Sequence, residues 1–167
     1  MLSSLLLVSA GAVSTCSVPP SEAERQASLS YATFDSQPPP YGWRHLSGAG
    51  CTDAAVFLLN AYATANSGLS ATNAMELSFH IGQALALAGR ENESITHFER
   101  SLRPEAKPEW SAYVQATLAF LRHDTAALQA ARNAYIAVAP NSMRLRFIDG
   151  FLACPNEPYA KAVHCRL

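Results

Sequence analysis

The stretch that decides the fold is Thr72–Arg103, which reads TNAMELSFHIGQALALAGRENESITHFERSLR. Apolar and small residues recur in it at the helical spacing that indicates two amphipathic helices. The recurring positions are Leu77, Ile81, Gly82, Leu85 and Ala88, followed by Ile95, Phe98, Ser101 and Leu102. Gly89 lies between the two runs, and a glycine can take the left-handed conformation that ends a helix. We therefore predict two antiparallel helices joined by a tight turn.

Both predicted helices carry recognisable end signals. Asn73 stands three residues before Glu76, a spacing that suits an N-cap with a reciprocal acid. Asn92 can cap the second helix in the same way, and Pro104 ends it. These signals place the hairpin between residues 72 and 103.

Gly82 stands inside the first predicted helix, where glycine costs about 1 kcal/mol relative to alanine. We expect it to allow a close approach to the second helix, with the small residues Ser94 and Ser101 packed against it. The alternative is an incidental weak spot, because isolated glycines are tolerated in helices.

The order of these residues resembles the tetratricopeptide repeat (TPR). That repeat carries leucine-glycine, a large apolar residue, glycine, alanine, an aromatic residue and alanine at similar spacings. Ser94 and Ser101 stand where the repeat usually has alanine, and Ser78 stands near its usual tryptophan. The matching positions are Ile81-Gly82, Leu85, Gly89, Ser94-Ile95, Phe98 and Ser101-Leu102.

A weaker second copy follows at a shift of 33 residues, close to the TPR period of about 34. It runs from Glu109 to Pro140, and Leu85 falls on Leu118, whereas the position of Gly82 is taken by Gln115. The resemblance implies an all-α fold, a right-handed α-α superhelix of about two TPR-like hairpins with capping helices. We place this domain at residues 43–167, with caps expected at Trp43–Asn66 and Asn141–Ala153.

Residues 1–16, MLSSLLLVSAGAVSTC, contain an apolar run of signal-peptide length that is too short to span a bilayer stably. Val13-Ser14-Thr15-Cys16 looks like a bacterial lipobox, so Cys16 is a candidate for lipidation and membrane attachment. Ordinary secretion is the equal alternative, and a cytosolic protein is a third. We predict an exported bacterial protein, either in the periplasm or anchored to the outer membrane.

Residues 17–42 hold five prolines among many serines, glutamines and alanines. Proline disfavours both helix and strand, so this composition predicts an extended, flexible linker between the export signal and the folded domain.

Four cysteines are present, and Cys154 and Cys165 are close enough in sequence to bracket a turn. In an oxidising compartment they are our first choice for a disulfide. Cys51 would then be free and buried, although pairing of Cys51 with Cys154 or Cys165 remains an alternative.

No sequence motif indicates catalysis. There is no nucleotide-binding glycine pattern, no nucleophile motif and no zinc-binding spacing, so we predict no enzyme activity, no cofactor and no metal. The net charge of −1, without a basic patch, argues against nucleic acid as a partner. The alternative of a small helical enzyme or metal-binding protein would rest on His80, His97 or His123.

TPR families usually hold peptides on the inner face formed by the first helix of each repeat. The resemblance therefore implies a non-catalytic protein-interaction or scaffold module of the bacterial cell envelope, whose protein or peptide partner is unknown. An alternative is that this face is core, covered by a neighbouring helix or the proline-rich segment; another is a purely structural envelope lipoprotein. The candidate face comprises Glu76, Phe79, Gln83, Leu87, Ala112, Ala116 and Phe120.

Overall fold

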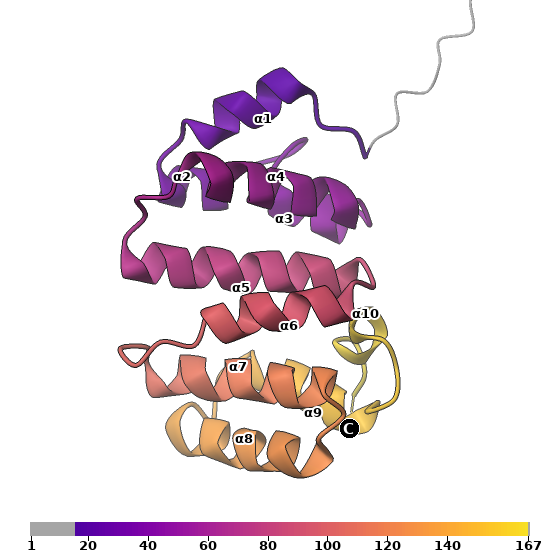
Figure 1. The fold of residues 1–167 in the computed structure, drawn as a ribbon. Coiled ribbons are helices and arrows are strands. Elements are labelled where there is room, and N and C mark those ends of the chain that lie inside the picture. Colours follow the sequence, from indigo (N-terminus) through magenta and orange to yellow (C-terminus); the bar gives the residue numbers. More distant parts are fainter. Residues whose placement is uncertain (1–15, 167) are drawn as a thin grey trace, which may run out of the picture.

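The computed structural model describes residues 16–166, and over these residues the chain is all-helical, with ten helices and no strand (Figure 1). The all-α fold class is therefore confirmed. The predicted export signal, apart from Cys16, lies outside the described residues. The helices are α1 (Pro20–Ala27), α2 (Tyr31–Asp35), α3 (Trp43–Gly48), α4 (Thr52–Ala65), α5 (Ala71–Leu87), α6 (Glu91–Arg100), α7 (Pro108–Leu121), α8 (Thr125–Val138), α9 (Leu145–Ala153) and α10 (Tyr159–Ala162).

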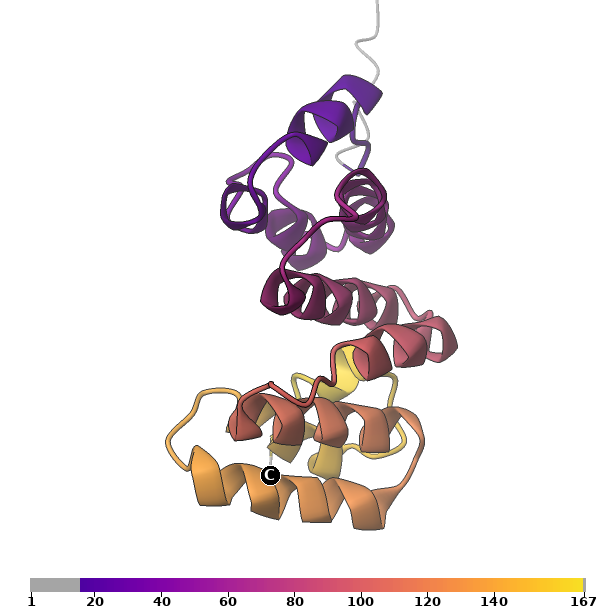
Figure 2. The ribbon, with the colours of Figure 1, turned by 60° about the vertical axis from the view of Figure 1, so that its left-hand side comes forward.

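Three hairpins, α3–α4, α5–α6 and α7–α8, follow one another along the long axis of the molecule (Figures 1 and 2). Each has a tight corner with a residue in the left-handed conformation, at Gly50 (φ 79°), Gly89 (φ 76°) and His123 (φ 56°). Trp43–Asn66, expected to be an N-terminal cap, forms the short helix α3, a corner of the same kind and the longer helix α4.

Backbone hydrogen bonds close these corners in the same way. In the central hairpin, the Gly89 amide donates to the Ala86 carbonyl at 3.1 Å, and the Arg90 amide donates to the Leu85 carbonyl at 2.9 Å. This is the Schellman pattern of a helix C-terminus. The predicted turn at Gly89 is confirmed.

The predicted N-caps are wrong by a few residues. Ser70 caps α5, because its hydroxyl accepts a hydrogen bond from the Asn73 amide at 3.3 Å, so the helix begins before Asn73. The Schellman corner leaves only Arg90 between Gly89 and the next helix, so Asn92 lies inside α6.

Gly82 lies where α5 and α6 approach closely, as predicted. A Cβ atom at this position would be 3.2 Å from the Phe98 ring and 3.2 Å from the Ser94 carbonyl oxygen. The second neighbour is thus Phe98 rather than Ser101. Ser101 is buried at the end of α6, where its carbonyl accepts a hydrogen bond from the Trp110 indole at 3.0 Å.

The core has two parts that share α5 as a common wall. Leu77 and Ile81 pack into the N-terminal part with residues of α1–α4. Phe79 and Ala86 pack into the C-terminal part with residues of α6–α10. Because different faces of α5 pack into the two parts of the core, this helix is buried over most of its length.

The prediction of an extended linker over residues 17–42 is wrong for this stretch, which forms α1 and α2. Pro20 lies in the first turn of α1, where a missing amide hydrogen is harmless. Tyr31 and Phe34 of α2 are buried, and the Phe34 ring stacks on Tyr62 of α4 with 3.9 Å between ring centres. This burial offsets the entropy cost that we expected to keep the segment extended.

The structure contains the predicted disulfide between Cys154 and Cys165. The expectation of a free Cys51 is wrong, because Cys51 is bonded to Cys16. Cys51 is at the N-terminus of α4, and the N-terminal segment folds back over the first hairpin, which brings Cys16 to it. Two disulfides indicate an oxidising compartment.

Candidate functional site

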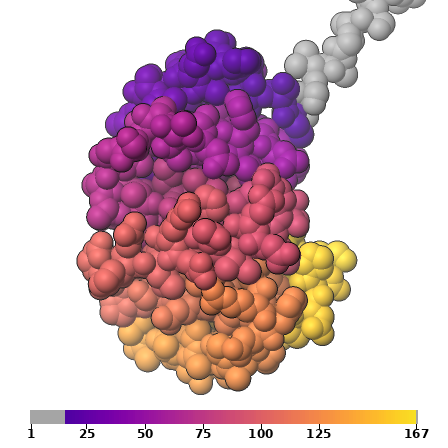
Figure 3. Space-filling view, viewed as in Figure 1, coloured from indigo at the N-terminus to yellow at the C-terminus, as the bar shows by residue number. Residues whose placement is uncertain are grey.

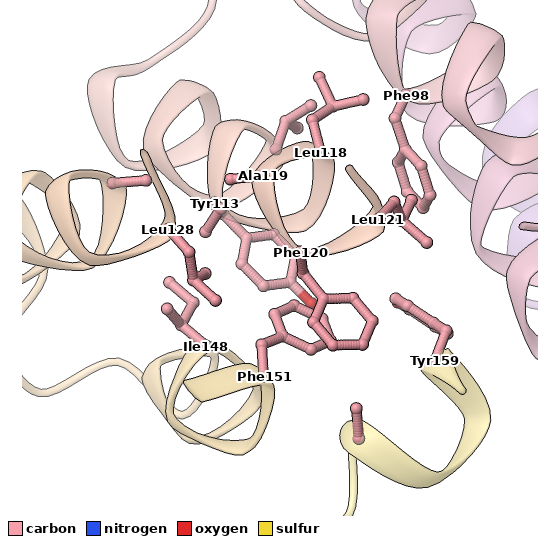
Figure 4. Packing of buried hydrophobic residues seen from close by; sticks show 14 of the residues in the cluster. Phe98, Tyr113, Leu118, Ala119, Phe120, Leu121, Leu128, Ile148, Phe151 and Tyr159 are labelled. Atoms are coloured by element: carbon pink, nitrogen blue, oxygen red, sulfur yellow. The ribbon is translucent and has the colours of Figure 1, made fainter. Parts of the chain in front are cut away.

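Most of the predicted inner face lies inside the core. Phe79, Ala112, Ala116 and Phe120 are each at most 5% exposed. The Phe120 ring stacks on that of Phe151 in α9, at 4.5 Å between centres, and Tyr159 of α10 lies beside both (Figure 4). For these four residues the alternative interpretation holds: they are core residues, covered by neighbouring helices.

The C-terminal segment is held firmly against the hairpins. The Tyr159 amide, at the start of α10, donates to the Glu91 carboxylate of α6 at 2.6 Å. Gly150 of α9 permits a close approach, since a Cβ there would lie 2.4 Å from the Ala162 carbonyl oxygen. The Cys154–Cys165 disulfide joins the two ends of the segment. Figure 3 shows this segment, in yellow, on the flank of the α5–α6 and α7–α8 hairpins.

The other three predicted residues, Glu76, Gln83 and Leu87, are half-buried and line two hollows. We call the first, of about 370 Å³, the Trp110 hollow. It is lined by Ala71, Thr72, Met75, Glu76, Glu105, Ala106, Lys107, Glu109, Trp110 and Arg144.

We call the second, of about 300 Å³, the Tyr159 cavity. The first helix of every hairpin contributes to it, and α9 and the α10 segment complete it. Its lining comprises Ser47 and Gly48 of α3, Gln83 and Leu87 of α5, Tyr113 of α7, and Phe147, Tyr159, Val163 and His164. No sequence pattern marks Ser47 or Tyr159 as site residues, because the two come together only in the folded chain.

Arg144 connects the two hollows. Its guanidinium carbon lies 5.9 Å from the ring centre of Trp110 and 5.8 Å from that of Tyr113. Trp110 lines one hollow and Tyr113 the other. The accessible part of the predicted face is therefore a charged hollow beside an apolar cavity.

A polar cluster around His80 joins α2, α3 and α5. The His80 Nδ1 atom lies 3.2 Å from the Asp35 carboxylate, and the Arg44 guanidinium donates to the other oxygen of that carboxylate at 2.6 Å. The Trp43 indole also donates to Asp35, at 3.2 Å, and the Tyr31 hydroxyl lies 3.4 Å from Nδ1.

The charges of this cluster favour a structural role. Burial raises the pKa of the Asp35 carboxyl, but hydrogen bonds from His80 and Arg44 outweigh it and lower that pKa to about 2. Burial lowers the pKa of His80, which the hydrogen bond to Asp35 only partly opposes. A neutral His80 donates from Nδ1 to Asp35, while Nε2, the atom a general base would use, faces Arg44 at 3.4 Å.

The three histidines of the alternative hypothesis do not share a site. His80 is buried in the cluster described above, and His97 is half-buried on α6. His123 is exposed at the α7–α8 corner. Between residues 16 and 166, no group of three or more histidine, cysteine, aspartate or glutamate side chains is arranged to hold a metal ion.

No protein-family model, no curated protein and no solved structure matches the chain. In the part of the chain that the structure describes, no helix combines the length and apolar character needed to cross a bilayer.

Proposed function

We propose that this chain is an exported, non-catalytic binding module of the bacterial envelope. In this proposal its hairpins form a TPR-like right-handed superhelix, and its inner face binds a segment of a partner protein. The Trp110 hollow is the observation that carries the proposal. It is the part of the face that α9 and α10 leave open, and charged side chains and the Trp110 ring line it.

The composition of the Trp110 hollow supports binding of a polypeptide. Tryptophan and arginine, here Trp110 and Arg144, are the residue types that most often dominate the energy of protein interfaces. Within the described residues, Glu76, Glu105 and Lys107 form no ion pair, although all three line the hollow. Charged side chains of a partner can pair with these groups without disrupting an existing contact.

Charge reversal at the rim tests the proposal. The whole exported protein, carrying an affinity tag, is crosslinked in envelope extract and recovered as wild type, Glu76→Lys or Arg144→Glu. We expect a specific partner to be retained by the wild type and lost in both variants. The matched control is Glu24→Lys, an exposed change on α1 far along the chain from the hollow.

Equal retention of the partner by all four proteins would exclude the Trp110 hollow as the binding site. Phe79 and Phe120 are unsuitable for this test, because a charge at either buried position would destabilise the fold.

We further propose that the protein is secreted to the periplasm with Cys16 in a disulfide. The thiol of Cys16 cannot form a disulfide with Cys51 and a thioether with a lipid at the same time. Alkylation of free thiols followed by mass spectrometry separates the two forms. We expect a linked Cys16–Cys51 peptide, whereas a lipoprotein would give a lipidated Cys16 and an alkylated Cys51.

A further inference from the structure

The Tyr159 cavity has the size and lining of a small-molecule site. Its volume is about 300 Å³, at the lower end of the range of ligand pockets. Leu87, Phe147 and the ring of Tyr113 give it an apolar wall. No aspartate, glutamate, lysine or arginine lines it.

Two of the residues that line this cavity have a hydroxyl group without a hydrogen-bond partner. The Ser47 Oγ and Tyr159 hydroxyl oxygens are buried without a hydrogen bond, and Gln26 Oε1 is the one other side-chain atom of this kind in the described chain. Tyr159 is 1% exposed. A buried polar group without a partner destabilises the folded state, so two at one cavity need an explanation.

The polar groups of the cavity are suited to a neutral acceptor. Burial raises the pKa of Tyr159 well above its ordinary value, and the nearby Gln83 amide only partly opposes this, at a geometry that falls short of a hydrogen bond. Tyr159 is therefore protonated and available as a donor, as is the Ser47 hydroxyl.

Charge and size narrow the class of ligand. An ammonium ion would enter a wall that holds no carboxylate, and a carboxylate would find only the imidazole of His164 in the wall and Arg144 against the Tyr113 ring, so either charge would lose its hydration with little compensation. Several waters could fill the cavity and satisfy the hydroxyls, but those against Leu87 and Phe147 would lack hydrogen-bond partners, which favours an apolar group there.

We propose that the Tyr159 cavity binds a small neutral molecule that combines an apolar ring or chain with a carbonyl oxygen, which accepts hydrogen bonds from Ser47 and Tyr159. The class includes amides, esters and lactones. The apolar part lies against Leu87 and Phe147. This site is separate from the Trp110 hollow and does not depend on a protein partner.

Benzamide is the probe that tests this inference, with benzoate, benzylamine and toluene as the anionic, cationic and purely apolar comparisons. Each is titrated into the oxidised, full-length exported protein, and the methyl resonances of Leu87 and Val163 are followed by NMR. We expect saturable binding of benzamide with a Kd of about 1 mM, as suits a fragment of this size. We expect binding at least about tenfold weaker for each of the other three.

Tyr159→Phe removes the donor without leaving a cavity. Since the hydroxyl has no partner, this variant should fold and unfold at the same temperature as the wild type or a higher one. Its affinity for benzamide should fall about tenfold. The matched control is Tyr135→Phe. The hydroxyl that it removes donates a hydrogen bond of 2.7 Å to the Ser142 hydroxyl, and neither residue lines the cavity. That variant should lose stability and keep its affinity for benzamide.

Any of three results would overturn the inference. The first is that benzamide fails to saturate the Leu87 and Val163 signals. The second is that toluene or benzoate binds as tightly as benzamide. The third is that Tyr159→Phe binds benzamide as well as the wild type does. None of these results bears on partner retention by the Glu76 and Arg144 variants, so the two proposals fail independently.

Discussion

Two corners of the fold predict opposite effects for substitutions at equivalent positions. Gly89 and His123 both adopt the left-handed conformation, with φ of 76° and 56°. A Cβ atom on Gly89 would meet no other atom within 4 Å, so Gly89→Ala changes the backbone preference without adding a clash. His123 already has a side chain at a position whose left-handed backbone conformation is unfavourable for any residue with a Cβ atom.

The size of each effect comes from two opposing contributions. A left-handed conformation costs an L-residue about 1–2 kcal/mol. Alanine loses less conformational entropy on folding than glycine does. This difference raises the free energy of unfolding by about 0.4–1 kcal/mol. We therefore expect Gly89→Ala to lower the free energy of unfolding by about 1 kcal/mol, and His123→Gly to raise it by about 0.5–1 kcal/mol.

Urea unfolding in oxidising buffer measures both changes through the midpoint at constant slope. The corresponding shift in melting temperature is about 2–4 °C per kcal/mol for a chain of this length. The double variant should show the sum of the two effects, since the corners belong to different hairpins and share no contact. Gly50→Ala, also with open space around its Cβ, is a third example of the loss.

A stabilising Gly89→Ala or a destabilising His123→Gly would refute this reasoning. Either would mean that the corner in question is not a Schellman turn, and the alignment of the three hairpins would lose its main support. A change in the slope of unfolding would instead indicate an altered denatured state and would call for the same measurement by thermal unfolding.

Three further predictions concern His80, the C-terminal disulfide and Gly82. Burial lowers the pKa of His80 below the 6.5 of the unfolded chain, and the hydrogen bond to Asp35 opposes this only in part. As the pH falls below 6.5, the unfolded chain therefore binds the proton first, and the folded state loses stability. Urea unfolding at pH 7.5 and about 5.5 should show this loss in the wild type and a smaller one in His80→Gln; equal losses would exclude His80 as its source. Replacing Cys154 and Cys165 together by serine opens a loop of 11 residues and should lower the free energy of unfolding by about 3 kcal/mol, and a neutral result would mean that the bridge does not form. Gly82→Leu should destabilise by about 1–3 kcal/mol in urea unfolding, since a Cβ there already lies 3.2 Å from two neighbours, and a neutral result would place Gly82 away from α6.

Local patterns were sufficient to predict the central hairpin. The apolar periodicity and Gly89 gave the two helices and their corner, and Gly82 marked their close approach. The second copy was harder to place, because a shift of 33 residues puts Arg122 at the position of Gly89, whereas His123 follows Gly89 by 34 residues and has the positive φ. Histidine at such a position carries no sequence signal comparable to glycine.

Features that depend on distant contacts could not be read from the sequence. Residues 17–42 have the composition of a linker, but Phe34 is ordered by Tyr62, which lies far along the chain. The Cys16–Cys51 pair depends on the same fold-back of the N-terminal segment. Of the predicted binding face, Glu76, Gln83 and Leu87 line the two hollows, whereas Phe79, Ala112, Ala116 and Phe120 lie in the core, and the sequence could not show that α9 and α10 cover part of this face.

The positions of the disulfides agree with the energetics of a stack of hairpins. A unit at the end of such a stack packs against one neighbour instead of two and is the first to open. Cys16–Cys51 ties the N-terminal segment to the first hairpin, and Cys154–Cys165 closes the segment that follows the last one. The central α5–α6 hairpin contains no cysteine and has core on both sides of α5. Both covalent bonds thus hold the segments that flank the stack in sequence, and an oxidising compartment is the one in which those bonds persist.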